Sequence, residues 1–444
     1  MTTFRFLNVV LLAASTALSA QTYTVLHNFG EDTSNVTGNI AQSRGGAMLT
    51  TSFNTAFRIW TGGSLEVLHQ FLNNSELAGG LILAGDGKFY STTEQGGQVN
   101  WGTVFKMSQD GSVTTLHEFT GGSDGAGPVA APIQSVEGDF YGTTSLGGGL
   151  NRYGTVYRIT KYGKFTLLHT FSPSDGESPQ GQLVQGTNYY FYGTAENGGK
   201  YGYGTIFRIS RSGDFKVLVN FNGTTGSFPN ARLIQANDGN FYGVVPMGGS
   251  SNGGVLFRMK PDGTLTVLHN FTGGSDGSGP QGGLVQASDG NLYGTNQFGG
   301  KNGNGVLFRA TLAGDVVPLH NFADSSGNYP YCALLQHTNG KLYGDTTGGG
   351  TLGYGVFFRF NAGLRPFVTY LPTYGRPGAL VQILGQGFTD SSEVRFNGIL
   401  ATDQVVYPTY IRAIVPDGAT TGPITVTTSG GTLTSNKVLI VHPH

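Results

Sequence analysis

Histidine recurs at a fixed motif position in this sequence, and a set of such histidines could hold a metal ion. Six copies of the motif carry histidine and one carries valine: His27, His69, His117, His169, Val219, His269 and His320. Metal ligands must converge to about 2 Å from one ion, whereas one histidine per repeat would be spread around the rim of the assembled repeats. We therefore expect no metal site and no cofactor, and a repeated structural hydrogen bond instead.

Aspartate recurs in the loops that join consecutive repeats and raises the possibility of calcium binding. The Asp-Gly pairs begin at Asp124, Asp175 and Asp276. Calcium takes about 6–8 oxygen ligands, and each loop offers roughly one carboxylate. Turn formation, in which aspartate bonds nearby backbone, is the simpler expectation, and the calcium alternative stays open.

No catalytic residues are expected. The sequence contains no nucleophile elbow, zinc-hydrolase helix motif, phosphate loop or dinucleotide fingerprint. Glu94 and Glu196 precede glycine loops and are the carboxylates that a polysaccharide-active enzyme would use. The one cysteine, Cys332, excludes an intrachain disulfide and lies in an apolar run, where burial is expected.

Loops rich in glycine carry aromatic, amide and basic side chains within an otherwise constant frame. Loops on a rigid scaffold commonly carry binding residues, and aromatic faces beside Asn and Lys suit sugar rings. The candidate ligand-binding residues are Asn100, Trp101, Arg152, Tyr153, Lys200, Tyr201, Tyr203, Lys301 and Tyr354. The alternative is that these side chains pack the loops onto the rim of the scaffold.

The scaffold that positions these loops is a repeat of about 50 residues. An aromatic-basic pair recurs seven times, at Phe57-Arg58, Phe105-Lys106, Tyr157-Arg158, Phe207-Arg208, Phe257-Arg258, Phe308-Arg309 and Phe358-Arg359. Residues 280–322 predict four strands, at 283–287, 291–296, 306–310 and 316–322, with a tight turn at Asp289-Gly290. Four strands in about 50 residues are typical of a β-propeller blade. The basic residues are expected to contact a neighbouring blade or its loops.

The two ends of the repeated region predict ring closure. A fourth-strand motif starts at Leu26, before the first aromatic-basic pair, and no copy follows the last pair. Residues Tyr23–Phe29 are therefore expected to pair with Val356–Phe360 and to remove an exposed sheet edge. The predicted fold is all-β: a seven-bladed β-propeller over residues 21–363, whose strand 22–29 closes the last blade.

The tandem units resemble the glycine-rich repeats of exported bacterial proteins with interchangeable C-terminal anchors, the choice-of-anchor tandem repeat proteins. The resemblance covers residues 40–360 and rests on Tyr141-Gly142-Thr143-Thr144, Gly147-Gly148, Gly154-Thr155-Val156-Tyr157 and their copies. It implies a secreted or cell-surface protein and brings no catalytic residues.

After Leu364 the period stops, and residues 366–444 form a separate predicted domain. This region resembles an IPT/TIG immunoglobulin-like domain through Val381–Phe388 (VQILGQGF), Val394–Gly398 (VRFNG) and Gly422–Val426 (GPITV). Short alternating strands bounded by turns independently predict a small β-sandwich. Such modules are commonly spacers or interaction domains.

The overall charge bears on possible partners, and the first twenty residues indicate export. The chain has 25 Lys+Arg against 26 Asp+Glu, so its charge gives no reason to expect nucleic acid or an acidic membrane surface as a partner. Residues 1–20 are typical of a signal peptide, with Arg5 before an apolar stretch at 9–18 and small residues at the cleavage zone. No later segment has the roughly 20 apolar residues of a membrane span.

These observations predict an exported, non-catalytic binding or adhesion protein that presents its glycine-loop face to extracellular glycan or to a surface protein. Two alternatives stay open. One is an extracellular polysaccharide-active enzyme with carboxylates at the propeller face, and the other is a structural component of the cell surface.

Overall fold

The computed structural model describes residues 21–442, apart from 35, 37, 72–74, 78, 150–151 and 373. The predicted signal peptide lies outside the described residues. Within them, the helices are two short 3-10 segments, η1 (Glu31–Thr33) and η2 (Asp324–Ser326). Neither of these described helices is long and apolar enough to cross a membrane.

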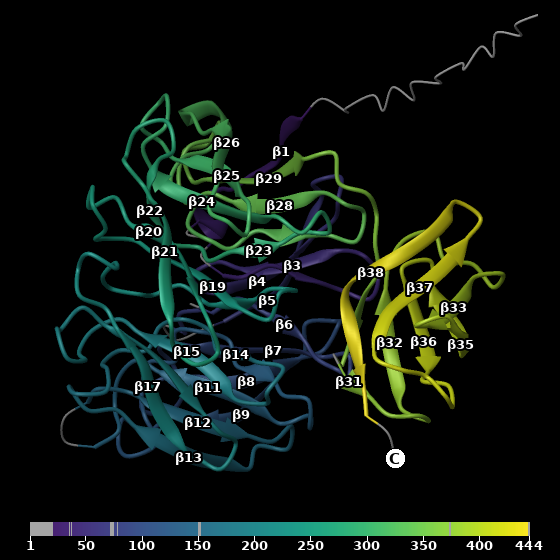
Figure 1. The fold of residues 1–444 in the computed structure, drawn as a ribbon, viewed down its shortest axis with the longest axis horizontal. Coiled ribbons are helices and arrows are strands. Elements are labelled where there is room, and N and C mark those ends of the chain that lie inside the picture. The colour runs from purple at the N-terminus through teal and green to yellow at the C-terminus, as the bar shows by residue number, and fades with distance from the viewer. Residues whose placement is uncertain are drawn as a thin grey trace, which may run out of the picture.

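Seven antiparallel, blade-like sheets follow one another along the described part of residues 22–361, which confirms the all-β prediction (Figure 1). Their strands, sheet by sheet, are β2 (Ala41–Gln42), β3 (Met48–Thr51), β4 (Thr55–Ile59) and β5 (Leu65–Gln70); β6 (Ile82–Leu83), β7 (Phe89–Thr93), β8 (Thr103–Met107) and β9 (Val113–Glu118); β10 (Ile133–Gln134), β11 (Phe140–Thr144), β12 (Thr155–Ile159) and β13 (Phe165–Thr170); β14 (Val184–Gln185), β15 (Phe191–Ala195), β16 (Thr205–Ile209) and β17 (Phe215–Asn220); β18 (Ile234–Gln235), β19 (Phe241–Val245), β20 (Val255–Met259) and β21 (Leu265–Asn270); β22 (Ser278–Pro280), β23 (Val285–Gln286), β24 (Leu292–Phe298), β25 (Val306–Ala310) and β26 (Val316–Asn321); and β27 (Leu335–Gln336), β28 (Leu342–Asp345) and β29 (Val356–Asn361), with β1 (Thr22–Asn28). The sixth sheet differs from the prediction, because its second strand extends to Phe298 and pairs with the additional strand β22.

Packing within a sheet explains why glycine recurs before the aromatic-basic pair. In the third sheet Gly142 pairs with Tyr157 across β11 and β12. A Cβ on Gly142 would lie 2.5 Å from Tyr157 Cζ, so only glycine lets the ring lie over the neighbouring strand. Tyr157 is fully buried. Strands such as β12 are buried at four of five positions, as their unbroken apolar sequence predicts for sheets covered on both faces.

Glutamine side chains join neighbouring sheets at their innermost strands. Gln235 of the fifth sheet accepts a hydrogen bond of 2.8 Å from the backbone N–H of Thr187 in the fourth. The same bond occurs at six seams, made by Gln42, Gln134, Gln185, Gln235, Gln286 and Gln336. Gln42 bonds Thr338 at 3.0 Å and so joins the seventh sheet to the first. At the seam between the first and second sheets, Leu83 stands where the others have glutamine.

The N-terminal strand enters the seventh sheet. β1 pairs with β29 in antiparallel register, with Tyr23 opposite Phe360, as the order of the motifs predicts. Phe29 N–H donates to Gly355 O at 3.0 Å, and Phe171 N–H donates to Gly154 O at the same distance in the third sheet. β1 therefore reproduces the contacts that an outer strand makes elsewhere (Figure 1).

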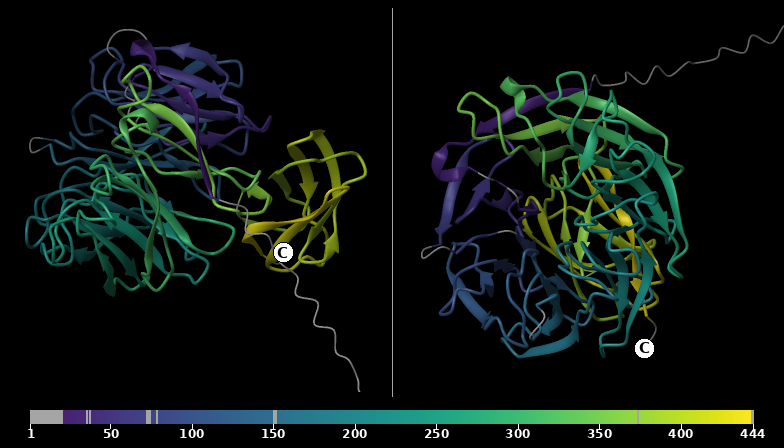
Figure 2. Two further views of the ribbon diagram at one scale, coloured as in Figure 1. Left: turned by 90° about the horizontal axis from the view of Figure 1, so that it is seen from above. Right: turned by 90° about the vertical axis from the view of Figure 1, so that its left-hand side faces the viewer.

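The C-terminal domain is a sandwich of two sheets. One contains β30 (Thr369–Leu371), β32 (Leu380–Leu384), β36 (Tyr410–Ile414) and β35 (Thr402–Tyr407); the other contains β31 (Tyr374–Gly375), β38 (Gly431–Val441), β37 (Gly422–Thr428), β33 (Glu393–Phe396) and β34 (Ile399–Leu400). Its core includes Val381, Phe396, Ile411 and Val426. The domain lies against one face of the repeat sheets, and Figure 2 shows its yellow strands behind the ring of sheets.

We call that face the turn face, because it carries the tight turns between the first and second strands of each sheet. Five of the seven sheets bond the C-terminal domain there, through Arg44, Gly85, Tyr189, Asn237 and Thr338. The long glycine loops between second and third strands lie on the opposite face, which we call the loop face.

Candidate functional site

The predicted binding residues lie on the loop face, and two pairs of them are in contact. The Arg152 guanidinium lies 5.2 Å from the Trp101 ring, which joins the loops of the second and third sheets. Lys200 Nζ lies 5.0 Å from the ring of its neighbour Tyr201. Tyr201, Tyr203 and Tyr354 are exposed at 49%, 40% and 40%. These residues remain candidates for contact with a ligand.

Several of the same residues also hold their own loops in place. Asn100 has a φ of 61° and accepts a hydrogen bond from Gly96 N–H at 2.8 Å. Tyr153 packs against the core of the third and fourth sheets. Tyr203 lies 6.0 Å from the Phe228 ring, and the Lys301 N–H donates to Asn321 at 2.8 Å. The alternative that these residues pack the loops onto the scaffold therefore holds for part of the candidate set.

The structure brings together two motifs that the sequence analysis treated separately. His117 bonds Asp124 at 3.1 Å, and His169 bonds Asp175 at the same distance. His269 bonds Asp276 at 3.0 Å. The carboxylates also accept bonds from their own turns, as Asp175 does from Ser172 N–H at 2.7 Å, which supports turn formation.

The predicted hydrogen bond is wrong for His320. Its ring stacks on Tyr23 of β1 at 3.8 Å, and its Nε2 is buried with no hydrogen-bond partner among the described residues. Burial lowers the pKa of His320 to about 4, so the imidazole stays neutral in this contact. Among the described residues, no three His, Cys, Asp or Glu side chains gather where they could hold a metal ion.

Lys106 and Arg58 contact a neighbouring sheet, as predicted, whereas Arg158 and Arg208 contact loops of their own sheets. Lys106 Nζ donates to Lys161 O of the third sheet at 3.1 Å. Arg58 donates to Gln109 O of the second sheet and pairs with Glu66 at 3.0 Å in its own sheet. Arg208 lies 4.5 Å from the Tyr190 ring.

The two candidate catalytic glutamates have different surroundings. Burial raises the pKa of Glu94, and the neighbouring Glu76 raises it further. Burial also raises the pKa of Glu196, while a hydrogen bond from Gln180 lowers it. Cys332 is buried, and its thiol contacts Asp345 in the seventh sheet, whose carboxyl is 1% exposed.

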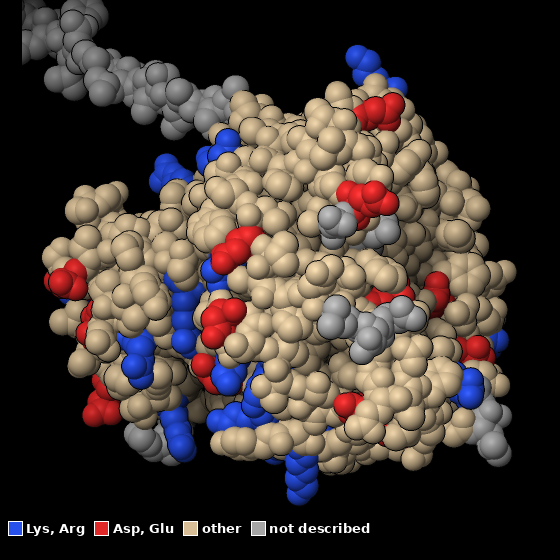
Figure 3. Space-filling view, turned by 180° about the vertical axis from the view of Figure 1, so that it is seen from behind, with Lys and Arg blue, Asp and Glu red and all other residues tan. Residues whose placement is uncertain are grey.

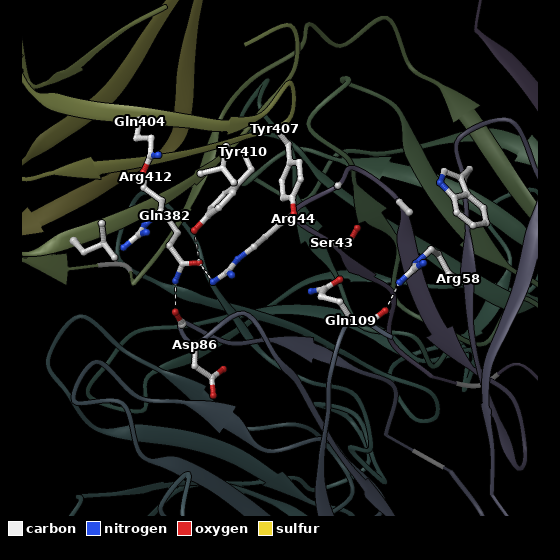
Figure 4. A pocket seen from close by; sticks show the side chains of 16 residues that line it. Ser43, Arg44, Arg58, Asp86, Gln109, Gln382, Gln404, Tyr407, Tyr410 and Arg412 are labelled. Carbon is white, nitrogen blue, oxygen red and sulfur yellow. Dashed lines mark hydrogen bonds between the residues drawn. The ribbon is translucent and has the colours of Figure 1, made fainter. Parts of the chain in front are cut away.

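A pronounced hollow lies elsewhere, between the turn face and the C-terminal domain. This turn cleft has a volume of about 670 Å³, within the roughly 300–1,000 Å³ of ligand pockets. The repeat sheets supply Arg44, Arg58, Trp60 and Asp86, and the C-terminal domain supplies Gln382, Gln404, Tyr407 and Arg412 (Figure 4). None of these eight residues was predicted from the sequence to bind a ligand.

One sheet face of the C-terminal domain forms a wall of the turn cleft. Arg412 of β36 pairs with Gln382 of β32 on one side and with Gln404 of β35 on the other, so the three side chains form a row across the sheet. Gln382 accepts a bond from Arg44 and donates to Gly85 O, and Tyr410 Oη donates to it at 3.1 Å. Gln382 thus links the domain to the first and second sheets.

Charge in the turn cleft is mainly positive. Asp86, the one carboxylate among the described lining residues, accepts bonds from Tyr90 Oη at 2.8 Å and Lys88 N–H at 3.1 Å. The Arg412 side chain is exposed, and its guanidinium makes no hydrogen bond or ion pair to a described residue. From behind, basic side chains gather along the boundary between the C-terminal domain and the repeats, with acidic ones among them (Figure 3).

Exposed aromatic rings also line the turn cleft. Trp60 is 39% exposed and Tyr407 is 51% exposed, and the Arg58 guanidinium lies 5.7 Å from the Trp60 ring. A sequence signal for this seam existed, because Leu83 stands where the other repeats have glutamine. Its meaning depended on where the C-terminal domain docks.

Comparison with solved structures supports the fold. A streptogramin B lyase is 14% identical, with a TM-score of 0.56, over 77% of this chain and 97% of that one. A virginiamycin B lyase from Staphylococcus aureus is 15% identical, with a TM-score of 0.54, over 77% and 98%. Both are β-propeller enzymes, and identity this low carries the fold alone. No curated relative matches the chain.

Family matches cover most of the sequence. The Gloeobacter/Verrucomicrobia repeat matches residues 48–238 and 190–399, and the IPT/TIG domain matches residues 367–440. The predicted IPT/TIG domain is therefore confirmed. The chain belongs to the Gloeobacter/Verrucomicrobia repeat family and carries an IPT/TIG domain after its repeats.

Proposed function

We propose that this chain is an exported, non-catalytic binding protein whose turn cleft holds a segment of acidic glycan. The lining of the cleft carries the proposal: it contains the exposed rings of Trp60 and Tyr407 and the exposed Arg412, whose guanidinium has no described hydrogen-bond or ion-pair partner. Aromatic faces suit the apolar faces of sugar rings. A planar guanidinium matches a carboxylate or sulfate through two parallel hydrogen bonds.

The seven sheets act in this proposal as the blades of one closed propeller. Six similar glutamine bonds, one of them between the seventh and first sheets, and the pairing of β1 with β29 support closure. Export rests on the features of residues 1–20 and on the resemblance to choice-of-anchor repeats. Placement outside the cell would bring the turn cleft into contact with polymeric glycans.

Binding, rather than hydrolysis, is favoured by the state of Asp86. Asp86 is the one carboxylate among the described residues that line the turn cleft. Its two oxygens accept hydrogen bonds from Tyr90 Oη and from the Lys88 N–H. Glycoside hydrolysis usually needs two carboxyl groups that flank the scissile bond.

Calorimetry against acidic and neutral oligosaccharides tests the proposal. Wild type should bind uronic-acid or sulfated oligomers, and Arg412→Gln and Trp60→Ala should each weaken binding by about tenfold or more, the loss of about 1.4 kcal/mol. Trp101→Ala and Tyr203→Ala are matched controls on the loop face and should bind as wild type does. Loss of binding in the controls alone would move the site to the loop face, and no acidic glycan bound by wild type would refute the proposal.

One observation supports the enzyme alternative. The pKa of Glu94 is raised by burial and by the neighbouring Glu76, and a pair of neighbouring carboxyl groups with unequal pKa values is the arrangement that glycosidases use. Turnover of a polymeric glycan that is lost in both Glu94→Gln and Glu76→Gln would establish that alternative.

A further inference from the structure

A second pocket lies between the turn face and the C-terminal domain, at the third and fourth sheets. It has a volume of about 420 Å³. Its lining includes Tyr189, Tyr190, Tyr374, His442, Glu137 and Arg211, and we call it the tyrosine pocket. The turn cleft shares none of these residues, since it is lined by the first and second sheets and by other strands of the C-terminal domain.

Tyr189 occupies a backbone position that glycine fills in every other repeat. Its φ is 67°, whereas the equivalent residues Gly46, Gly87, Gly138, Gly239, Gly290 and Gly340 have φ between 80° and 94°. The turn itself is the same, because Tyr189 N–H donates to Gly186 O at 2.9 Å and Gly239 N–H donates to Ala236 O at 2.9 Å. A bulky residue is strained in this left-handed region, and such strain persists mainly where the side chain has a use.

The Tyr189 side chain points across the boundary to the C-terminal domain. Its hydroxyl bonds His442 Nε2, and the two ring centroids are 5.9 Å apart. The Tyr374 ring lies at the same distance from the His442 ring. Tyr189 nevertheless keeps 38% of its surface exposed, so part of its ring is available to a ligand.

The charges of the tyrosine pocket cancel, unlike those of the turn cleft. Arg211 Nη1 pairs with Glu137 Oε1 at 2.6 Å, and these are the one cation and the one carboxylate among the described lining residues apart from His442. Tyr190 is covered on one face by Arg208. Rings that keep a polar hydroxyl at their edge, with no net charge around them, suit an uncharged polar ligand with apolar ring faces.

We propose that the tyrosine pocket is a second carbohydrate site, which takes an uncharged sugar ring stacked on Tyr189. The inference rests on the proposed function, since it assigns a neutral unit of a glycan to this pocket and the acidic units to the turn cleft. In this proposal tyrosine is kept at position 189 despite its strained backbone, because its ring is the surface on which the sugar stacks. Glycine would fit the turn better but would provide no such surface.

The experiment is calorimetry of the full chain with four neutral probes: cellohexaose, xylohexaose, mannohexaose and chitohexaose. At least one should bind to wild type. Tyr189→Gly should weaken that binding by about tenfold or more, while the midpoint of thermal unfolding is not lowered, because the other repeats form the same turn with glycine. Tyr189→Phe keeps the ring and should bind within about threefold of wild type.

A role in domain docking alone predicts the opposite pattern. In that case no neutral probe binds to wild type, and Tyr189→Gly, Tyr189→Phe and His442→Ala all expose the C-terminal domain to limited proteolysis. That pattern overturns the inference. Trp60→Ala separates the two sites: it should leave neutral-sugar binding unchanged, so a failure of the turn cleft to bind acidic glycan would not be mistaken for a failure of the tyrosine pocket.

Discussion

The seam between the first and second sheets differs from the six other seams of the ring. At the six, a glutamine of an innermost strand accepts a backbone N–H from the preceding sheet, as Gln235 does from Thr187 at 2.8 Å. At the exceptional seam, Leu83 replaces the glutamine, and Gln382 of the C-terminal domain reaches both sheets through Arg44 and Gly85. The turn cleft opens at this seam.

This difference shows how a repeated fold acquires a specific site. A repeated bond makes every seam alike and leaves no place where one ligand would be preferred. Where the repeated glutamine bond is missing, residues beside the seam are free to contact another domain, as Arg44 contacts Gln382. The interruption at Tyr189 follows the same rule, because it too lies where the C-terminal domain contacts a turn.

The largest expected effect comes from breaking the closing seam. Deletion of residues 21–29 removes β1 and the fully buried Phe29. Loss of a buried phenylalanine alone costs about 3–5 kcal/mol, out of the roughly 5–15 kcal/mol that stabilises a domain. The deletion should aggregate or unfold at a much lower temperature in a thermal melt. Deletion of residues 366–444 is the matched truncation and should leave the repeat sheets folded; a silent N-terminal deletion would contradict closure by β1.

The closing seam also carries a buried carboxyl, at a position where five of the other sheets have threonine and the fifth sheet has Val244. Asp345 is equivalent to Thr194, whose hydroxyl bonds Ala231 O of the next sheet at 3.3 Å. Burial raises the pKa of Asp345 from 3.8 to about 7, and the neighbouring Cys332 thiol lowers it in part. Because the folded-state pKa is raised, folding takes up a proton between about pH 4 and 7, and stability falls as the pH rises through that interval.

Asp345→Thr should therefore stabilise the protein at high pH. About three pKa units at roughly 1.4 kcal/mol each give as much as about 4 kcal/mol at pH 8 and little at pH 4. Chemical denaturation at the two pH values measures this. Equal effects of the substitution at both would show that ionisation of Asp345 is not the cause.

At a regular seam, Gln235→Ala should cost about 1–3 kcal/mol, because it leaves the Thr187 N–H and Gly239 O without their partner. Gln382→Ala is the comparison at the exceptional seam. It should leave the unfolding midpoint of the repeat sheets unchanged and increase proteolysis between the repeats and the C-terminal domain. If both variants lower the midpoint equally, the two kinds of seam do not differ in the way described.

The smallest effect is expected from Leu83→Gln, which supplies the glutamine that the exceptional seam lacks. A new backbone hydrogen bond contributes about 0.5–1.5 kcal/mol, and the loss of apolar contact by the partly buried Leu83 offsets part of it. Denaturant unfolding should show a stabilisation below about 1 kcal/mol. A clear destabilisation would mean that this seam is too different in geometry to accept the repeated bond.

Much of the fold could be predicted from the sequence, and little of the candidate site. The four strands of each unit and the pairing of Tyr23–Phe29 with Val356–Phe360 follow from motif order, because a repeated unit must bury the same positions in every copy. The pairing of His169 with Asp175 was missed although both residues had been noticed, since it depends on how a loop folds back on the preceding strand.

The sequence by itself determined the repeat, the blade-like sheets and their closing strand, since periodic burial of Phe, Tyr and Gly leaves few other arrangements. Only the tertiary structure decided where the C-terminal domain docks, and with it the turn cleft and the tyrosine pocket. Those sites join residues such as Arg44 of the first sheet and Gln382 of the C-terminal domain, which are hundreds of positions apart in the sequence. Docking of two folded domains depends on the shape and charge of both surfaces, and a periodic sequence pattern predicts neither the shape nor the charge of those surfaces.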